Sequence, residues 1–243
     1  MSSNEYTRRT VVKEAVASAA LGKERTLRVF VPPGYNELSS HRIVYCQDGE
    51  ECFNFGRIAT TATKLILDEG VEPFLVVGVD VDLPHRTEEY APDGARFEAY
   101  SAFFLREMMP YVESRYAVRT GPGDRVLVGD SLGGTVSLHL SLQVPDLIQK
   151  VIALSGAFLA PSFAAVSAAE DLAWLRLYQL IGTEETAVET SRGTFDFLEA
   201  NRRFRPLLEA RGADVHYVEK AGKHLWGFWQ QELPDALRWA LAE

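Results

Sequence analysis

Short apolar segments rich in β-branched residues alternate with longer helix-like segments along this chain, and this order constrains the fold more than any other feature. The central apolar segments are nearly continuous, which is typical of strands buried on both faces of a sheet. Strands and helices in alternation predict an α/β protein with a mostly parallel sheet, covered by helices on both faces. The predicted strands are residues 26–31, 42–46, 74–81, 125–128, 151–154, 177–181 and 215–218. The predicted helices are residues 58–68, 97–111, 132–144, 195–209 and 233–241.

The chain length suits a single unit of this kind. Its 243 residues can bury a full core, and we predict one domain over residues 1–243 with no large separate cap domain. Gly70, Pro145 and Gly212 stand where helices are expected to end. Residues 82–96 and 156–171 fit neither a helix nor a strand, and long loops on such a sheet commonly line its functional site.

The charge and hydropathy of the chain exclude several classes of partner. A formal net charge of −9 argues against a nucleic-acid partner, because such a protein needs a concentrated basic surface. The stretch after Arg8 and Arg9 is broken by charges, unlike the core of a signal peptide. No window reaches the roughly 18 apolar residues of a membrane-spanning helix. We therefore expect a cytoplasmic protein with no membrane partner.

The two cysteines give no sign of metal or redox chemistry. Cys46 and Cys52 lack the short paired spacing of a zinc or redox site, so we expect both to be reduced thiols. We accordingly expect no metal and no cofactor. The sequence does not decide the oligomeric state, and a homodimer is compatible with it.

The stretch VLVGDSLGG, residues 126–134, places a serine where a strand ends and a helix begins. Gly129 and Gly133 flank Ser131 in the pattern G-x-S-x-G, which keeps side chains away from a sharp, strained turn that exposes a nucleophile. The Leu132 amide at the helix start can donate to an oxyanion. A serine that merely caps the helix is the alternative interpretation.

A serine nucleophile needs a base, and the base needs an orienting acid. In this strand-turn-helix setting the chain order is serine, acid, histidine, which leaves His216 and His224 as candidates. His216 lies within an alternating strand and is expected to be a packed or surface side chain. His224 follows that strand and a glycine, in a loop that can direct it toward the carboxyl edge of the sheet, so we predict His224 as the base.

The acid is less narrowly determined by the residues themselves. The strand ending at Gly182 is followed by Glu184 and Glu185, which places both carboxylates at the edge where active sites of open α/β sheets lie. We favour Glu185. Glu184 as an exposed carboxylate and Asp196 as a first-turn helix acid are the rivals.

A second oxyanion donor is expected from the turn after an earlier strand. Asp48, Gly49 and Glu50 form such a turn, in which Gly49 would let the backbone approach the serine. The backbone amide, not the Glu50 side chain, would act. An ordinary surface Asp-Gly turn is the alternative.

Six segments together resemble the serine esterase family of the α/β hydrolases, which includes the enterochelin (siderophore) esterases, esterase D and the mycolyltransferases. They are YCQDGEECF, RTEEYAP, FLREMMPYVESRY, VLVGDSLGG, IGTEE and GKHLWGFW, and the likeness runs from about Thr26 to Leu241. The resemblance implies the α/β-hydrolase fold and a triad of Ser131, Glu185 and His224. It also implies an oxyanion hole made by the amides of Glu50 and Leu132.

The resemblance implies hydrolysis of a small-molecule carboxylic ester through an acyl-enzyme, on short-chain acyl esters or a siderophore-type ester. Acyl transfer to an alcohol and an inactive hydrolase-like binding protein are the alternatives. Arg57, Arg86 and Trp226 are candidate substrate contacts, although either arginine could instead be an ion-pair partner and Trp226 could simply pack the last helix. The net negative charge of the chain is not what an anionic iron complex would require.

Overall fold

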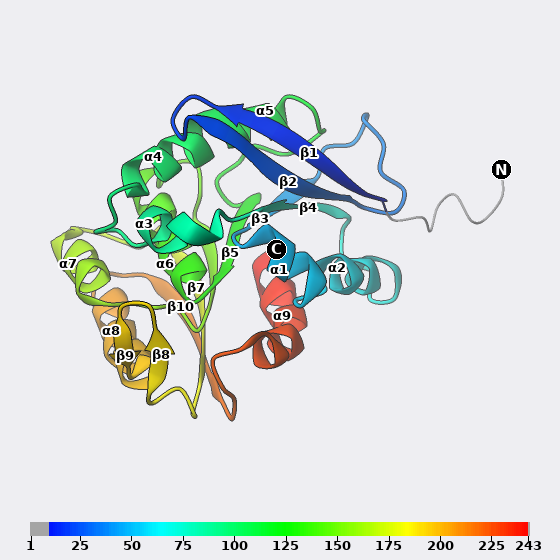
Figure 1. Cartoon of the computed structure of the whole chain (residues 1–243). Coiled ribbons are helices and arrows are strands. Elements are labelled where there is room, and N and C mark those ends of the chain that lie inside the picture. The colour runs from blue at the N-terminus through cyan, green and yellow to red at the C-terminus, as the bar shows by residue number, and fades with distance from the viewer. Residues whose placement is uncertain (1–9, 243) are drawn as a thin grey trace.

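An eight-stranded sheet forms the centre of the computed structural model, which describes residues 10–242 (Figure 1). Its strand order is β1-β2-β4-β3-β5-β6-β7-β10. β1 and β2 pair antiparallel, β2 and β4 pair antiparallel, and the remaining neighbours pair parallel. The strands are β1 (Thr10–Ser18), β2 (Lys23–Val31), β3 (Arg42–Cys46), β4 (Phe74–Val79), β5 (Arg125–Asp130), β6 (Lys150–Leu154), β7 (Arg176–Gly182) and β10 (Asp214–Lys220).

Helices cover both faces of the sheet, as Figure 1 shows. On one side lie α1 (Gly49–Asn54), α2 (Ile58–Leu67) and α9 (Trp226–Leu241). On the other lie α3 (Arg86–Tyr90), α4 (Phe97–Ala102), the π-helix η2 (Phe103–Met108), α5 (Met109–Glu113), α6 (Leu132–Gln143), α7 (Ala160–Ala168) and α8 (Phe197–Glu209). A short 3-10 turn, η1 (Leu83–His85), precedes α3, and a small hairpin of β8 (Val188–Thr190) and β9 (Gly193–Phe195) follows β7.

Alternate residues of the central strands face opposite cores. In β3, Ile43 and Tyr45 belong to one buried cluster and Val44 to the other. In β5, Leu127 faces the first cluster, while Val126 and Val128 face the second. All of these side chains are at most 1% exposed. This period of two explains why the strands read as continuous apolar runs, since both faces are buried.

The predicted α/β fold is confirmed, and each of the seven predicted strands is present, with the predicted bounds for β3 and slightly different bounds for the others. β1 was missed because four of its first residues are exposed, as expected of an edge strand that shows no apolar pattern. The predicted helix 97–111 is a run from α4 through η2 to α5 that ends at Glu113. Gly70 and Gly212 both adopt a left-handed φ after helices, as expected.

Four further elements correct the sequence-based boundaries. Residues 82–96 are not a plain loop, because they contain η1 and α3, and residues 156–171 contain α7. The last helix begins at Trp226 rather than at Leu233, because its apolar face against α2 and the sheet includes Phe228 and Trp229. Pro234 is accommodated within this helix, although Pro commonly ends one.

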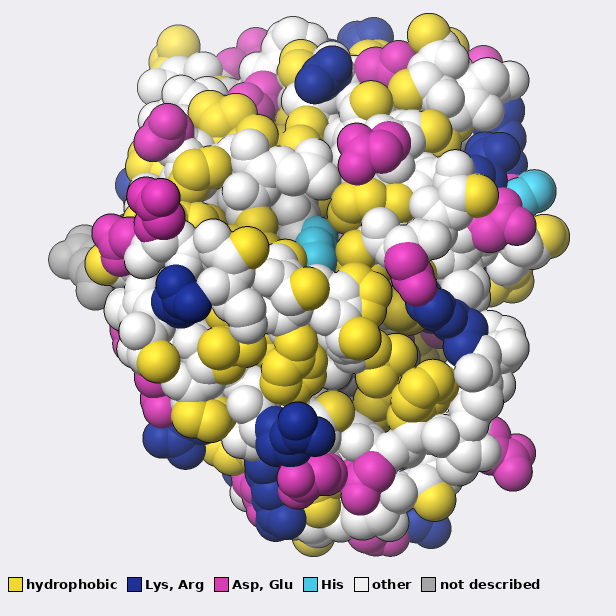
Figure 2. Space-filling view, turned by 90° about the vertical axis from the view of Figure 1, so that its left-hand side faces the viewer, with side chains coloured by type: hydrophobic (Ala, Val, Ile, Leu, Met, Phe, Trp, Pro, Cys, Tyr) yellow, Lys and Arg dark blue, Asp and Glu magenta, His cyan; other side chains and the backbone are white. Residues whose placement is uncertain are grey.

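Among residues 10–242, no helix is long and apolar enough to cross a membrane. Arg8 and Arg9, which entered the signal-peptide analysis, lie outside the described residues. Figure 2 shows basic and acidic side chains interspersed on one face of the molecule, with no extended basic patch there.

The central position of β5 leads to a stability prediction. We expect Leu127→Ala to lower the free energy of unfolding by about 3 kcal/mol, because it removes a fully buried side chain from the middle of the sheet. Leu38→Ala is the matched control, since Leu38 is 99% exposed and its loss should change the free energy of unfolding by under about 0.5 kcal/mol. Urea unfolding followed by circular dichroism measures both values, and equal midpoints for the two variants would contradict the assignment of this core.

Candidate active site

Ser131 sits on a sharp turn between β5 and α6. Its φ of 52° and ψ of −122° lie outside the usual regions for a residue with a side chain, which marks a strained backbone. The Ser131 amide is held by the Leu154 carbonyl of β6 at 2.9 Å. A Cβ atom at Gly129 would collide with the backbone of Gly133, so the turn requires glycine there. The G-x-S-x-G pattern therefore forms the expected tight turn.

His224 and Glu185 meet at the carboxyl edge of the sheet. His224 lies in the loop between β10 and α9, and its Nδ1 is 2.6 Å from Glu185 Oε2. The His224 ring packs edge-on against Trp229 and beside Phe197, at centroid distances of 4.9 and 5.0 Å. These contacts restrict the orientation of the ring. The His224 side chain is 14% exposed, and it is accessible from a hollow that it lines.

The Glu185 carboxylate is fully buried and has defined partners on both oxygens. Oε1 accepts hydrogen bonds from the Gly182 amide at 2.9 Å and from Ser155 Oγ at 2.6 Å. Ser155 Oγ in turn accepts from Trp229 Nε1 at 2.7 Å. A buried carboxylate is stable only with such donors, so the hydrogen bonds fix Glu185 toward His224.

Ser155 and Trp229 were not singled out from the sequence. Ser155 directly follows β6 and has a left-handed φ of 53°, which places its hydroxyl at the same sheet edge. The only signal was a small polar residue at the carboxyl end of a predicted strand, and this signal is weak without knowledge of the neighbouring strand. No signal in the sequence pointed to the hydrogen bond from Trp229 to Ser155.

The rival candidates lie elsewhere. Glu184 is exposed and its nearest cation is Lys223 at 3.8 Å, while Asp196 caps α8 by accepting the Glu199 amide at 2.8 Å. His216 packs against Tyr178 and Trp239 on β10. None of these three side chains contacts Glu185 or His224 within the described residues.

The Asp48-Gly49-Glu50 turn packs against the serine turn. A Cβ added at Gly133 would lie 3.0 Å from Asp48 Oδ2 and 3.1 Å from Gln47 Cβ, so the two turns are in contact. Asp48 has a left-handed φ of 49°, and a Cβ at Gly49 would lie 2.5 Å from the Gly78 backbone. Glu50 and Leu132 both stand in the first turn of a helix, where backbone amides lack intrahelical partners.

Arg86 holds this turn in place. Its Nε and Nη2 donate to the two carboxylate oxygens of Asp48 at 2.7 and 2.8 Å, and its guanidinium also lies over the Tyr90 ring. The Asp48 side chain is only 2% exposed, so this bidentate pair is largely shielded from water. Arg86 thus forms an ion pair, the alternative that the sequence left open, and its partner is Asp48.

Asp130, the residue before the nucleophile candidate, is a second buried carboxyl group. It is 4% exposed, one of its oxygens has no hydrogen-bond partner, and Arg86 Nη2 lies 4.0 Å from the other. Burial, together with the negative charges of Asp48 and Glu51 and opposed by Arg86, raises the pKa of Asp130 to about 8.

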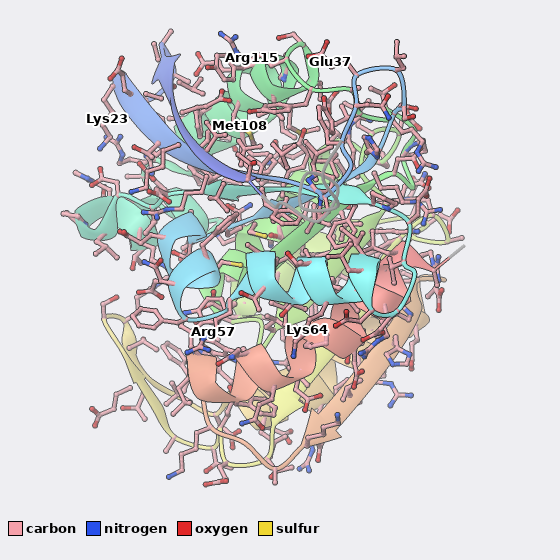
Figure 3. The ribbon with its side chains drawn as sticks, turned by 90° about the vertical axis from the view of Figure 1, so that its right-hand side faces the viewer. Lys23, Glu37, Arg57, Lys64, Met108 and Arg115 are labelled. Carbon is pink, nitrogen blue, oxygen red and sulfur yellow. The ribbon has the colours of Figure 1, made fainter. Side chains whose placement is uncertain are left out.

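These groups surround one hollow of about 460 Å³. Ser131, Leu132, His224, Arg86 and Trp226 all line it. Within the described residues the Ser131 hydroxyl has no hydrogen-bond partner, and catalytic hydrogen bonds are often loose without substrate. Arg57 does not line this hollow. It lies at the start of α2, where that helix faces α9 (Figure 3), and lines a separate groove with Lys64.

The β8–β9 hairpin forms part of the wall of the hollow, a role that the sequence did not predict. Glu189, Thr190, Ser191, Arg192 and Phe195 all line it. The hairpin tip contacts the opposite wall: Arg192 makes a bidentate ion pair with Asp93, and Ser191 and Thr87 hydroxyls are 3.3 Å apart.

Comparisons with known proteins agree with this architecture. The family model described as "Putative esterase" matches residues 18–240. The chain belongs to this esterase family. The esterase is also 33% identical over 231 residues to "Uncharacterized protein YjcH" of Bacillus subtilis (strain 168), across 94% of this chain and 96% of that protein.

Solved structures show the same fold. A ferulic acid esterase superposes with a TM-score of 0.81 at 18% identity, covering 96% of this chain and 98% of the other. The enterochelin esterase from Shigella flexneri superposes with a TM-score of 0.81 at 19% identity, covering 96% of this chain and 58% of the other. The α/β-hydrolase fold and the resemblance to serine esterases are confirmed, and the protein is a serine ester hydrolase acting on small-molecule esters.

The two arginines of the hollow differ in burial, and this leads to a stability prediction. We expect Arg86→Met to lower the free energy of unfolding by about 3 kcal/mol, because it leaves the Asp48 carboxylate buried without a cation. Arg192→Met should cost under about 1 kcal/mol, since both partners of the Arg192–Asp93 pair are more than one third exposed. Urea unfolding measures both. Adding Asp48→Asn to Arg86→Met should restore part of the lost free energy of unfolding. If it restores none, the loss does not come from the broken Arg86–Asp48 pair.

The raised pKa of Asp130 predicts a pH dependence of stability. Between about pH 4 and pH 8 the folded protein keeps the Asp130 proton that the unfolded chain releases, so this group lowers the free energy of unfolding as the pH rises. Asp130→Asn cannot ionise. The free energy of unfolding of Asp130→Asn minus that of the parent should therefore increase by at least about 1 kcal/mol from pH 5 to pH 8.

Urea unfolding of both proteins at the two pH values measures this difference. Asp146→Asn, at an exposed position, is the control substitution. Parallel pH profiles for Asp130→Asn and the parent would contradict a protonated Asp130 in the folded protein.

Proposed function

We propose that the esterase hydrolyses carboxylic esters through an acyl-enzyme, with Ser131 as nucleophile, His224 as base and Glu185 as acid. The observation that supports this best is the 2.6 Å contact between His224 Nδ1 and the buried Glu185 carboxylate, beside the hollow that Ser131 lines. A buried acid that holds one imidazole nitrogen leaves the other free to accept a proton.

In the first half of the reaction, Ser131 Oγ attacks the ester carbonyl carbon as His224 Nε2 takes the hydroxyl proton. Glu185 keeps the imidazole oriented and stabilises its charged form. The amides of Leu132 and Glu50 donate hydrogen bonds to the developing oxyanion. His224 then protonates the leaving alcohol, and Ser131 is left acylated.

In the second half, His224 takes a proton from water as the water oxygen attacks the acyl carbon. The bond from that carbon to Ser131 Oγ then breaks, His224 returns the proton to Oγ, and the acid is released. Acyl transfer to an alcohol would replace water at this step. The contact of the Asp48-Gly49-Glu50 turn with Gly133 supports the assignment of the second oxyanion donor to this turn. Trp226 lines the hollow and is proposed as a substrate contact, whereas Arg86 is proposed to hold the oxyanion turn.

Substitutions at the three positions test the mechanism. Ser131→Ala and His224→Ala should each lower kcat for p-nitrophenyl acetate on the order of a millionfold, because the two residues act as one unit. Glu185→Gln should lower kcat by roughly ten-thousandfold, because an amide no longer holds the imidazole in the required tautomer. Release of p-nitrophenolate measures the rates, and urea unfolding verifies that each variant folds.

Asp196→Asn is the matched control for Glu185→Gln. Asn caps a helix about as well as Asp, so kcat should change by less than about twofold. A fluorophosphonate probe should label the parent at Ser131 and fail to label Ser131→Ala. Undiminished hydrolysis by Ser131→Ala would rule out the acyl-enzyme at this residue.

A further inference from the structure

The hollow beside Ser131 contains both acidic and basic side chains, and their partners differ. Besides His224, the titratable residues that line it are Glu51, Arg86, Asp130, Glu189 and Arg192, and burial raises the pKa of Asp130 to about 8. The nominal charges nearly cancel. The electrostatic field that a substrate meets in the hollow depends on which of these charges are already offset by a partner outside it.

Both arginines are offset in this way. Arg86 donates through two nitrogens to Asp48, and Arg192 donates through two nitrogens to Asp93. Neither Asp48 nor Asp93 lines the hollow. Because each bidentate pair occupies one guanidinium edge and offsets the positive charge, neither arginine presents an uncompensated charge to an anionic substrate.

The acids that line the hollow have no cation of their own. The Glu189 side chain is exposed and makes no hydrogen bond or ion pair within the described residues. Among the described residues, the Glu51 carboxylate accepts a hydrogen bond only from the uncharged Trp226 indole, at 2.9 Å. Asp130 has one unpartnered oxygen and shares Arg86 with Asp48 at a distance of 4.0 Å.

The response of Asp130 agrees with a negative environment. Burial is the largest cause of its raised pKa, the charges of Asp48 and Glu51 raise the pKa further, and the single nearby cation, Arg86, lowers it without reversing the shift. The chain as a whole carries a formal charge of −9, so the surroundings of the hollow do not supply a compensating positive field.

We propose that this hollow selects its ester by charge: it accepts uncharged esters, favours cationic ones, and disfavours esters that carry a negative charge. This inference rests on the proposed function of Ser131. The selecting groups are Glu51 and Glu189, which stand in the wall without a cationic partner. The apolar remainder of the lining, with Leu159, Leu225 and Phe195, suits the uncharged part of the substrate.

Three p-nitrophenyl esters of similar length test the selection. Their acyl chains are derived from adipate monomethyl ester (uncharged), adipate (anionic) and 6-(trimethylammonio)hexanoate (cationic). At low ionic strength kcat/KM for the anionic ester should be about tenfold below that for the uncharged ester, and the cationic ester should equal or exceed the uncharged one. The methyl ester is larger than the carboxylate, so a steric effect would act in the opposite direction.

Two changes should reduce the difference between anionic and uncharged esters. Glu189→Gln changes an exposed position where folding is not at risk, and it should lower the ratio of kcat/KM for the uncharged ester to kcat/KM for the anionic ester by about twofold. The double variant Glu51→Gln/Glu189→Gln should lower this ratio further. Sodium chloride at high concentration should have the same effect through screening. Glu37→Gln is the matched control, because Glu37 is exposed in the loop that precedes β3, away from the carboxyl edge of the sheet (Figure 3), and should leave the ratio unchanged.

An anionic ester that is hydrolysed as well as the uncharged one at low ionic strength, with turnover that Ser131→Ala abolishes, would overturn the proposed selection while leaving the nucleophile assignment intact. Turnover that persists in Ser131→Ala would overturn the proposed function instead. The uncatalysed hydrolysis of each ester is subtracted before the ratios are compared.

Discussion

The close approach of β5 and α6 is the constraint on which the site depends. The turn between them can be this tight only because Gly129 carries no side chain next to the Gly133 backbone. Because the turn is tight, Ser131 adopts a strained backbone conformation with a positive φ. The hydrogen bond from the Ser131 amide to the Leu154 carbonyl of β6 holds it in this conformation. The sheet therefore supplies the rigidity that keeps a strained residue in one position.

The second requirement is a stable arrangement of carboxylates away from water. Glu185 is stabilised by a backbone amide, a serine hydroxyl and the imidazole, and Asp48 by a bidentate arginine. Asp130 has only a distant share of Arg86, at 4.0 Å, and burial raises its pKa to about 8, so protonation takes the place of close partners. Three buried acids within one region thus reach stability in three different ways, by hydrogen bonding, by ion pairing and by neutralisation.

Much of the fold could be predicted from the sequence because the central strands are buried on both faces. Continuous apolar runs at β3 to β7 identify such strands directly, whereas β1 has an exposed face and α3 is only five residues long, so neither has a clear pattern. The positions of Ser131 and His224 followed from glycine spacing and chain order. Ser155 could not be found, because its role depends on β6 and β7 lying side by side, which is a tertiary relation.

The wall of the hollow was the least predictable part for the same reason. The hairpin of β8 and β9 pairs only with itself and meets the α3 side through Arg192 and Asp93, which are 99 positions apart. Within the described residues this hairpin shares no strand pairing with the central sheet, so its tip at Ser191 and Arg192 can change in length or composition without altering the register of β5, β6 or β7, whereas Val188 and Phe195 pack against Ile181 and Phe197. A family of enzymes built on this sheet can thus acquire new substrates by changing one short surface segment, while the residues that surround Ser131 stay as they are.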